Sequence, residues 1–155
     1  MGAAIAGWNK LHLIMEEGAV IQNNHTTGAH YGGGVFLANG STFEMNGGEI
    51  KNNEANRGGG VSLIGSSMEM SGGSISENRT YDVSNDAYGG AIYIADYEFI
   101  SGVSGTQNAI LPHEASFSMT DGTISKNTAV ATGGAILSFR RATENPVTKG
   151  KQSQS

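Results

Sequence analysis

A nine-residue pattern, Met-x-x-Gly-x-(Ile/Val)-x-x-Asn, occurs four times in this chain, and a Gly-Gly or Gly-Gly-Gly step follows each copy after a short gap. The copies are Met15, Gly18, Val20 and Asn23; Met45, Gly48, Ile50 and Asn53; Met70, Gly73, Ile75 and Asn78; and Met119, Gly122, Ile124 and Asn127. Self-similarity at a spacing of roughly 20 to 50 residues is typical of solenoids and propellers. The chain is therefore a repeat array, and this fact constrains the fold before any strand is assigned.

The residues around each copy indicate short strands joined by corners. Apolar residues alternate with polar ones up to each methionine, as in Phe43 and Met45, and a period of two indicates a strand with one buried face. The glycine after each methionine allows the chain to turn a corner. The asparagine marks a second corner, where stacked asparagines can bond to one another and to the backbone. A third strand begins at the glycine step, as in Val35 and Leu37. Three strands and three corners make one coil.

The spacing of the copies favours a parallel β-helix over a propeller. Successive methionines are 30, 25 and 49 residues apart. A propeller blade needs about 40 to 50 residues, so the shortest repeat is too short for one. The chain has 24 glycines and 2 prolines, which suits short strands and tight corners more than a helical bundle. We expect an all-β solenoid, a parallel β-helix of about four coils with three short strands each.

The repeats set the expected domain boundaries. Residues 1–139 form the repeat domain, and residues 140–155 form a basic tail that we predict to be disordered. The coils are expected near residues 11–37, 41–64, 66–95 and 115–139, with a loop insertion at about 96–114. The array begins and ends in mid-coil, and neither end shows the polar cap that solenoids need. We therefore expect a segment of a longer array that self-associates through its uncapped coil ends.

Charge and composition exclude several classes of partner. Residues 1–139 carry 5 basic and 13 acidic side chains, a net charge of −8, which disfavours nucleic acid as a partner. With no cysteine, the chain has no disulfide framework and no thiolate metal site. It shows no signal peptide or anchor, and no run approaches the roughly 18 apolar residues of a membrane span. We expect no membrane insertion and no cofactor.

Two carboxylates are the best candidates for chemistry in the repeats. Glu44 and Glu69 each precede a methionine, so they should stack on the outer face of adjacent coils. Polysaccharide lyases and hydrolases with β-helix folds need clustered carboxylates, often with Ca²⁺. The equivalent positions in the other copies are Ile14 and Ser118, which leaves the pair without a third acidic partner. A solvated ladder is the preferred interpretation, and a catalytic or calcium-binding pair is the alternative.

The insertion holds the candidate binding residues. From Ile92 to Met119 the chain uses 27 residues where the other copies use 9 or 10. Insertions in repeat arrays project as loops on one face and often bind ligands. Tyr97, Phe99, His113 and Glu114 form an aromatic and acidic mixture suited to a sugar or a protein partner. The alternative is an inert loop whose aromatic residues only cover the side of the solenoid.

Two segments carry a family resemblance. Ile50-Lys-Asn-Asn53-Glu-Ala55 with Gly58-Gly-Gly-Val61, and Ile124-Ser-Lys-Asn127-Thr-Ala129 with Gly133-Gly-Ala-Ile136, resemble the repeats of bacterial surface proteins. The likeness is to polymorphic outer-membrane and adhesin-type right-handed β-helix families, with Ile where those families place Phe, and it covers roughly residues 11–139.

The resemblance implies a right-handed parallel β-helix in a secreted or surface-displayed passenger region used in adhesion. The expected location is extracellular or on the cell surface, and the expected partner is a host or cell-surface protein or glycan. The expected function is thus a non-enzymatic, adhesin-like segment or structural spacer. The alternative is a carbohydrate-binding or polysaccharide-cleaving fragment.

Overall fold

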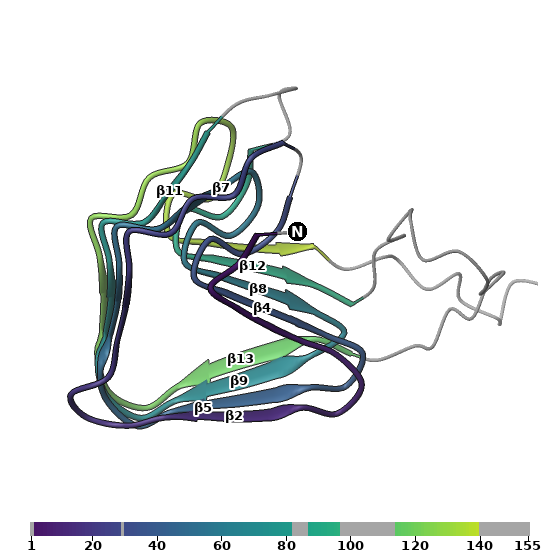
Figure 1. The fold of residues 1–155 in the computed structure, drawn as a ribbon, viewed down its shortest axis with the longest axis vertical. Coiled ribbons are helices and arrows are strands. Elements are labelled where there is room, and N and C mark those ends of the chain that lie inside the picture. Colours follow the sequence, from purple (N-terminus) through teal and green to yellow (C-terminus); the bar gives the residue numbers. More distant parts are fainter. Residues whose placement is uncertain (1, 29, 82–86, 97–113, 140–155) are drawn as a thin grey trace, which may run out of the picture.

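The computed structural model describes residues 2–28, 30–81, 87–96 and 114–139, and these contain fifteen β-strands and no helix. Every strand pairing among them is parallel. The strands stack into three main sheets around a shared interior, a solenoid-like arrangement (Figure 1).

Each sheet collects one strand from each successive repeat. The methionine sheet contains β2 (His12–Met15), β5 (Thr42–Met45), β9 (Ser67–Met70) and β13 (Ser116–Met119). The isoleucine sheet contains β3 (Val20–Gln22), β6 (Glu49–Lys51), β10 (Ser74–Ser76) and β14 (Thr123–Ser125). The five-stranded sheet contains β1 (Ile5–Gly7), β4 (Val35–Ala38), β8 (Val61–Ile64), β12 (Ile92–Ala95) and β15 (Ile136–Phe139). A short fourth sheet pairs β7 (Glu54–Ala55) with β11 (Arg79–Thr80).

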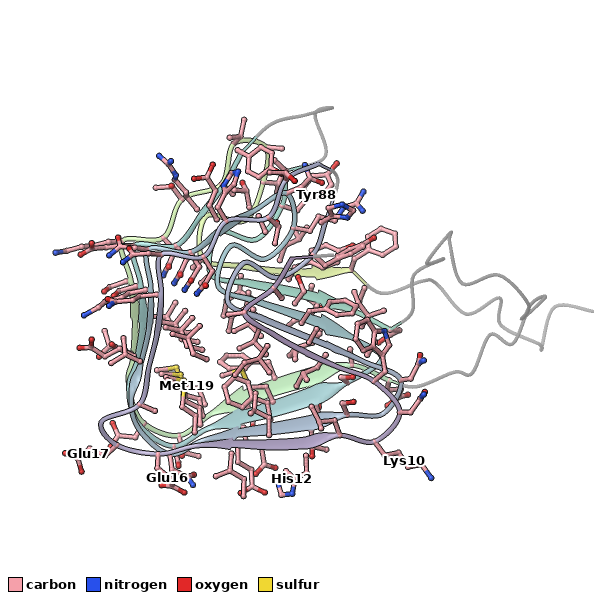
Figure 2. The ribbon with its side chains drawn as sticks, viewed as in Figure 1. Lys10, His12, Glu16, Glu17, Tyr88 and Met119 are labelled. Carbon is pink, nitrogen blue, oxygen red and sulfur yellow. The ribbon has the colours of Figure 1, made fainter. Side chains whose placement is uncertain are left out.

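The interior consists of columns of similar apolar side chains. Met45 pairs with Met15 on one side and with Met70 on the other, and Ile50 pairs with Ile75 in the next sheet. The alternation of the sequence sends these side chains inward, where Met45 and Ile50 are fully buried. Met119 also points into the space between the sheets (Figure 2), but it is 41% exposed because β13 is the outermost strand of its sheet.

The first repeat aligns one residue later than the sequence pattern predicts. Ile21, and not Val20, pairs with Ile50. The asparagine that bonds to Asn53 is correspondingly Asn24, and not Asn23. The reason is an extra residue in the first corner, where four residues separate Met15 from Val20 but three separate the equivalent pair in the next repeat. The assignment of Val20 and Asn23 to the repeat columns was therefore wrong.

The asparagine ladder joins successive coils at one corner. Its members are Asn24, Asn53, Asn78 and Asn127, and each of the first three donates from Nδ2 to the Oδ1 of the next at 2.8 to 3.0 Å. The same Oδ1 atoms accept the backbone N–H of the preceding asparagine. These bonds satisfy polar groups that the coil interior would otherwise leave without partners.

The glycine steps allow neighbouring coils to approach closely. Gly59, the middle glycine of one step, lies against the backbone of the next coil, where a Cβ would collide with the carbonyl oxygens of Arg79 and Gly90. Gly58, which precedes it, has a φ of 64°, in the left-handed region that favours glycine. A side chain at Gly59 would therefore push the coils apart.

Asp96 and Ala115, on either side of the insertion, lie close together, and we call this pair the neck of the insertion. The backbone N–H of Ala115 donates to Asp96 Oδ1 at 3.1 Å, and Ala115 is buried in the core. Residues 97–113 and the tail at 140–155 lie outside the described residues. Within the described part of the chain, no helix has the length and apolar character needed to cross a membrane.

Candidate functional site

The outer face of the methionine sheet carries the predicted carboxylate pair. Glu44 and Glu69 are direct partners in the pairing of β5 with β9, and the equivalent positions hold Ile14 and Ser118. The two glutamates line a shallow groove of about 240 Å³. The groove's other lining residues are Asn46, Met70, Ser71, Ser118 and Thr120. The groove thus presents carboxylates, an amide and hydroxyls to solvent.

His12 contacts Glu44 of this pair, which the sequence did not predict. Its Nε2 lies 2.9 Å from Glu44 Oε1, with both side chains about half exposed. His12 lies on the outer face of β2, on the lower side of the molecule in Figure 2. The sequence could have predicted this contact, because the alternation of His12 with Leu13 places His12 on the same face of the sheet as Glu44. Among the described residues, no group of three or more His, Cys, Asp or Glu side chains could hold a metal ion.

A second polar cluster surrounds Glu54 at a corner of the stack. Arg79 donates to Glu54 Oε2 from Nη2 at 2.6 Å and from Nε at 2.8 Å. His25 Nδ1 lies 3.7 Å from the same oxygen, and the His25 ring lies 5.2 Å from the ring of Tyr81. These side chains come from successive coils, so the cluster ties the coils together beside the asparagine ladder.

Tyr81 completes this cluster and contacts the connection that follows β3. Its hydroxyl lies within hydrogen-bonding distance of the backbone oxygens of Thr26 and Gly28, and its single proton is donated between them. Burial raises the pKa of the Tyr81 phenol above its usual value of 10.0, and the nearby Glu54 carboxylate raises it further. The phenol is therefore protonated at neutral pH and acts as a structural donor.

The outer face of the five-stranded sheet is apolar and aromatic. Phe36 and Tyr93, at facing-out positions of β4 and β12, are almost fully buried there. The Tyr31 ring packs on both, at 5.9 Å from Phe36 and 6.0 Å from Tyr93, and Trp8 meets Phe36 edge-on at 5.3 Å. The guanidinium of Arg57 lies 5.2 Å from the centre of the Tyr31 ring and donates to its hydroxyl at 2.7 Å.

A groove of about 390 Å³ opens at one end of this face, and we call it the aromatic groove. Its lining residues are Arg57, Tyr88, Tyr93, Thr132, Leu137 and Phe139. Arg57 bridges to Tyr88 and Tyr88 to Thr132 by parallel β-bridges, so these three belong to consecutive coils. Tyr93 pairs with Leu137 in the adjoining column. Phe139 pairs with Ala95 two positions further along the same strands, so three columns of the stack form the walls of the groove.

Of the four binding residues that the sequence predicted, the structure describes one, Glu114. Tyr97, Phe99 and His113 lie outside the described residues. Glu114 is exposed, next to the neck of the insertion, and does not line either groove. The strand residues Phe36 and Tyr93 could have been found from their alternation with Val35 and Ile92. Tyr88 lies in a connection, where alternation gives no signal.

The comparisons with known proteins add no relative. The chain matches no family model, no curated protein and no solved structure. Its function is therefore inferred from the geometry of its faces.

Proposed function

We propose that the chain is a segment of a right-handed parallel β-helix that acts as a non-enzymatic, surface-displayed scaffold, either adhesin-like or a structural spacer. The observation that best supports this proposal is the contrast between the repeated interior side chains and the varied exterior side chains. Interior positions repeat the same residue types from coil to coil, as in the methionine column, while the outward positions vary. Such a stack holds diverse surfaces at fixed positions along one axis.

We infer the location and the partners of the protein from the resemblance of its repeats to surface β-helix families. The scaffold would stand outside the cell or on its surface, and would meet a host or cell-surface protein or glycan. The net charge of −5 agrees with a partner that is not nucleic acid.

The environment of the carboxylates supports a non-enzymatic role. Carboxylates that cleave polysaccharides work in sites that hold the substrate and limit water. Glu69 is exposed, and Glu44 is engaged by His12 on an open face. The pair is therefore open to solvent, which favours the non-enzymatic role.

One observation favours a second function, in which the chain binds or cleaves a polysaccharide. Glu44 and Glu69 lie on neighbouring strands and line the same groove. Paired strands are about 4.8 Å apart, and the two carboxyl groups of retaining glycosidases are separated by about 5 to 5.5 Å. The strands that carry this pair are therefore about as far apart as those carboxyl groups, and the residue types suit that chemistry.

Product analysis separates the two functions. Purified protein would be incubated with polygalacturonate and with a neutral glucan, alongside Glu44→Gln, Glu69→Gln and the control Ser118→Ala, which alters the same groove without touching a carboxylate. The scaffold role predicts no product from any of the four proteins. Cleavage by the parent and by Ser118→Ala, lost in both glutamine variants, would overturn it and establish the enzyme.

A further inference from the structure

The aromatic groove has the composition of a ligand site. Tyr88 and Phe139 provide most of the ring surface beside the nearly buried Tyr93, while Arg57 and Thr132 place polar groups in the same wall. Small-ligand sites are concave, mainly apolar, and carry a few placed polar groups that orient the ligand. Phe139 is 59% exposed on the outermost strand β15, so its ring is accessible to a ligand in the groove.

We propose that the aromatic groove binds a saccharide built of pyranose rings. This inference rests on the display role proposed above, and it names the face and the ligand class. A pyranose ring has one face of C–H groups and a rim of hydroxyls. The aromatic rings offer apolar surface for the first, and the tyrosine, threonine and guanidinium groups offer hydrogen-bonding chemistry for the second.

The orientation of the groove suits an extended ligand. Arg57, Tyr88 and Thr132 come from consecutive coils, so the groove runs along the stack, with its side chains repeating at the strand spacing of about 4.8 Å. An oligosaccharide lying along this axis would meet a new set of side chains from each coil. The groove also lies on the opposite side of the molecule from the glutamate pair, as the positions of Tyr88 and His12 in Figure 2 show.

The walls of the groove are held in place before any ligand arrives. The Tyr31 ring packs against Tyr93 and carries the Arg57 guanidinium on its face, and Phe36 and Trp8 extend the packing away from the groove. Tyr93 stands on a central strand of the five-stranded sheet. Fixed side chains lose little conformational entropy on binding, which favours recognition of a flexible chain of sugars.

The test uses the full chain and defined hexasaccharides of glucose, N-acetylglucosamine, mannose and galacturonic acid. Binding would be measured by saturation-transfer NMR and isothermal calorimetry. We expect at least one hexasaccharide to bind. Phe139→Ala and Tyr88→Ala should each weaken that binding about tenfold, equivalent to about 1.4 kcal/mol. Tyr88→Phe, which keeps the ring, should retain more affinity than Tyr88→Ala.

Ile14→Ala is the matched control, because Ile14 is an exposed apolar side chain on the methionine sheet and is 51% exposed. It should leave saccharide binding unchanged. Since Phe139 is largely exposed, Phe139→Ala should fold normally, as circular dichroism would verify, and it decides the outcome if Tyr88→Ala does not fold.

Two results would overturn the saccharide site while leaving the display role intact. One is binding that Phe139→Ala does not weaken but Glu69→Gln does, which would place the site on the methionine sheet. The other is no binding of any hexasaccharide together with binding of a proline-rich peptide, the other ligand class that aromatic grooves accept. Cleavage of a hexasaccharide would instead contradict the non-enzymatic role.

Discussion

Asn53 uses all the hydrogen-bonding capacity of its side-chain amide inside the stack. Its Oδ1 accepts from the backbone N–H and the Nδ2 of Asn24, and its Nδ2 donates to Asn78 Oδ1 and to the backbone oxygen of Ile21. The side chain is fully buried. No other residue type of this size offers two donors and two acceptor lone pairs in this arrangement. The repeat therefore requires asparagine here for bonding and not only for turning the chain.

Replacing Asn53 with alanine should destabilise the protein by about 1 to 3 kcal/mol, because the change leaves buried partners unsatisfied on both sides of the ladder. Chemical denaturation of the variant and the parent would give the difference in free energy of unfolding. Asn46→Ala is the control. Asn46 bonds to Glu16 and Ser71 on the surface, so its loss should cost within about 0.5 kcal/mol. Equal effects of the two variants would mean that the ladder adds nothing beyond surface bonding.

At the scale of the strands, position in the stack decides how much each interior side chain contributes. Met45 and Met119 occupy the same column of the methionine sheet, yet Met45 is fully buried on a central strand and Met119 is 41% exposed on an outermost one. Neighbouring coils enclose Met45 on both sides. Met119 has a described neighbouring strand, β9, on one side.

Met45→Ala should therefore cost about 2 to 5 kcal/mol, the range for truncating a buried methionine to alanine. Met119→Ala removes the same atoms from a partly solvated position and should cost much less. Thermal and denaturant unfolding of both variants would measure this gradient along the stack. Similar losses at the two positions would show that the end coil is as well packed as the centre.

The strands and their pairing could be predicted because period two and the repeated methionine fix both face and register. The pairing of Glu44 with Glu69 followed from this register alone. The first repeat was misaligned because its corner, Glu16 to Ala19, holds one more residue, and the position of a corner glycine does not reveal such a change.

The aromatic groove could not be predicted for a different reason. Arg57 and Tyr88 lie in connections of unequal length. The β-bridge between them depends on how the coils stack, which the sequence pattern does not give. The alternation in β12 predicts that Tyr93 faces outward. It does not predict which side chains lie beside Tyr93, because these come from connections whose position in the stack the sequence does not give. The sequence predicted binding in the insertion at 96–114, from its length and its aromatic and acidic residues, and residues 97–113 lie outside the described part of the chain.

At the scale of the whole molecule, each end of the stack exposes apolar side chains on outermost strands or beside them. Leu11, Ile14 and Val20 are 39%, 51% and 48% exposed at one end. Met119 and Ile136 are 41% and 37% exposed at the other. Surfaces of this kind, joined to strands at a sheet edge, favour association with another chain.

The purified chain should accordingly self-associate, with an average mass that rises across micromolar concentrations in sedimentation equilibrium. Val20→Lys and Ile136→Lys each place a charge at one end, so either should shift the equilibrium toward monomer, since an end-to-end contact needs both surfaces. Thr42→Lys is the control, because Thr42 is exposed on the outer face of the central strand β5. A monomer at all concentrations would show that the ends do not associate. Association that both end variants leave unchanged would place the contact on a side face, such as the one that carries the aromatic groove.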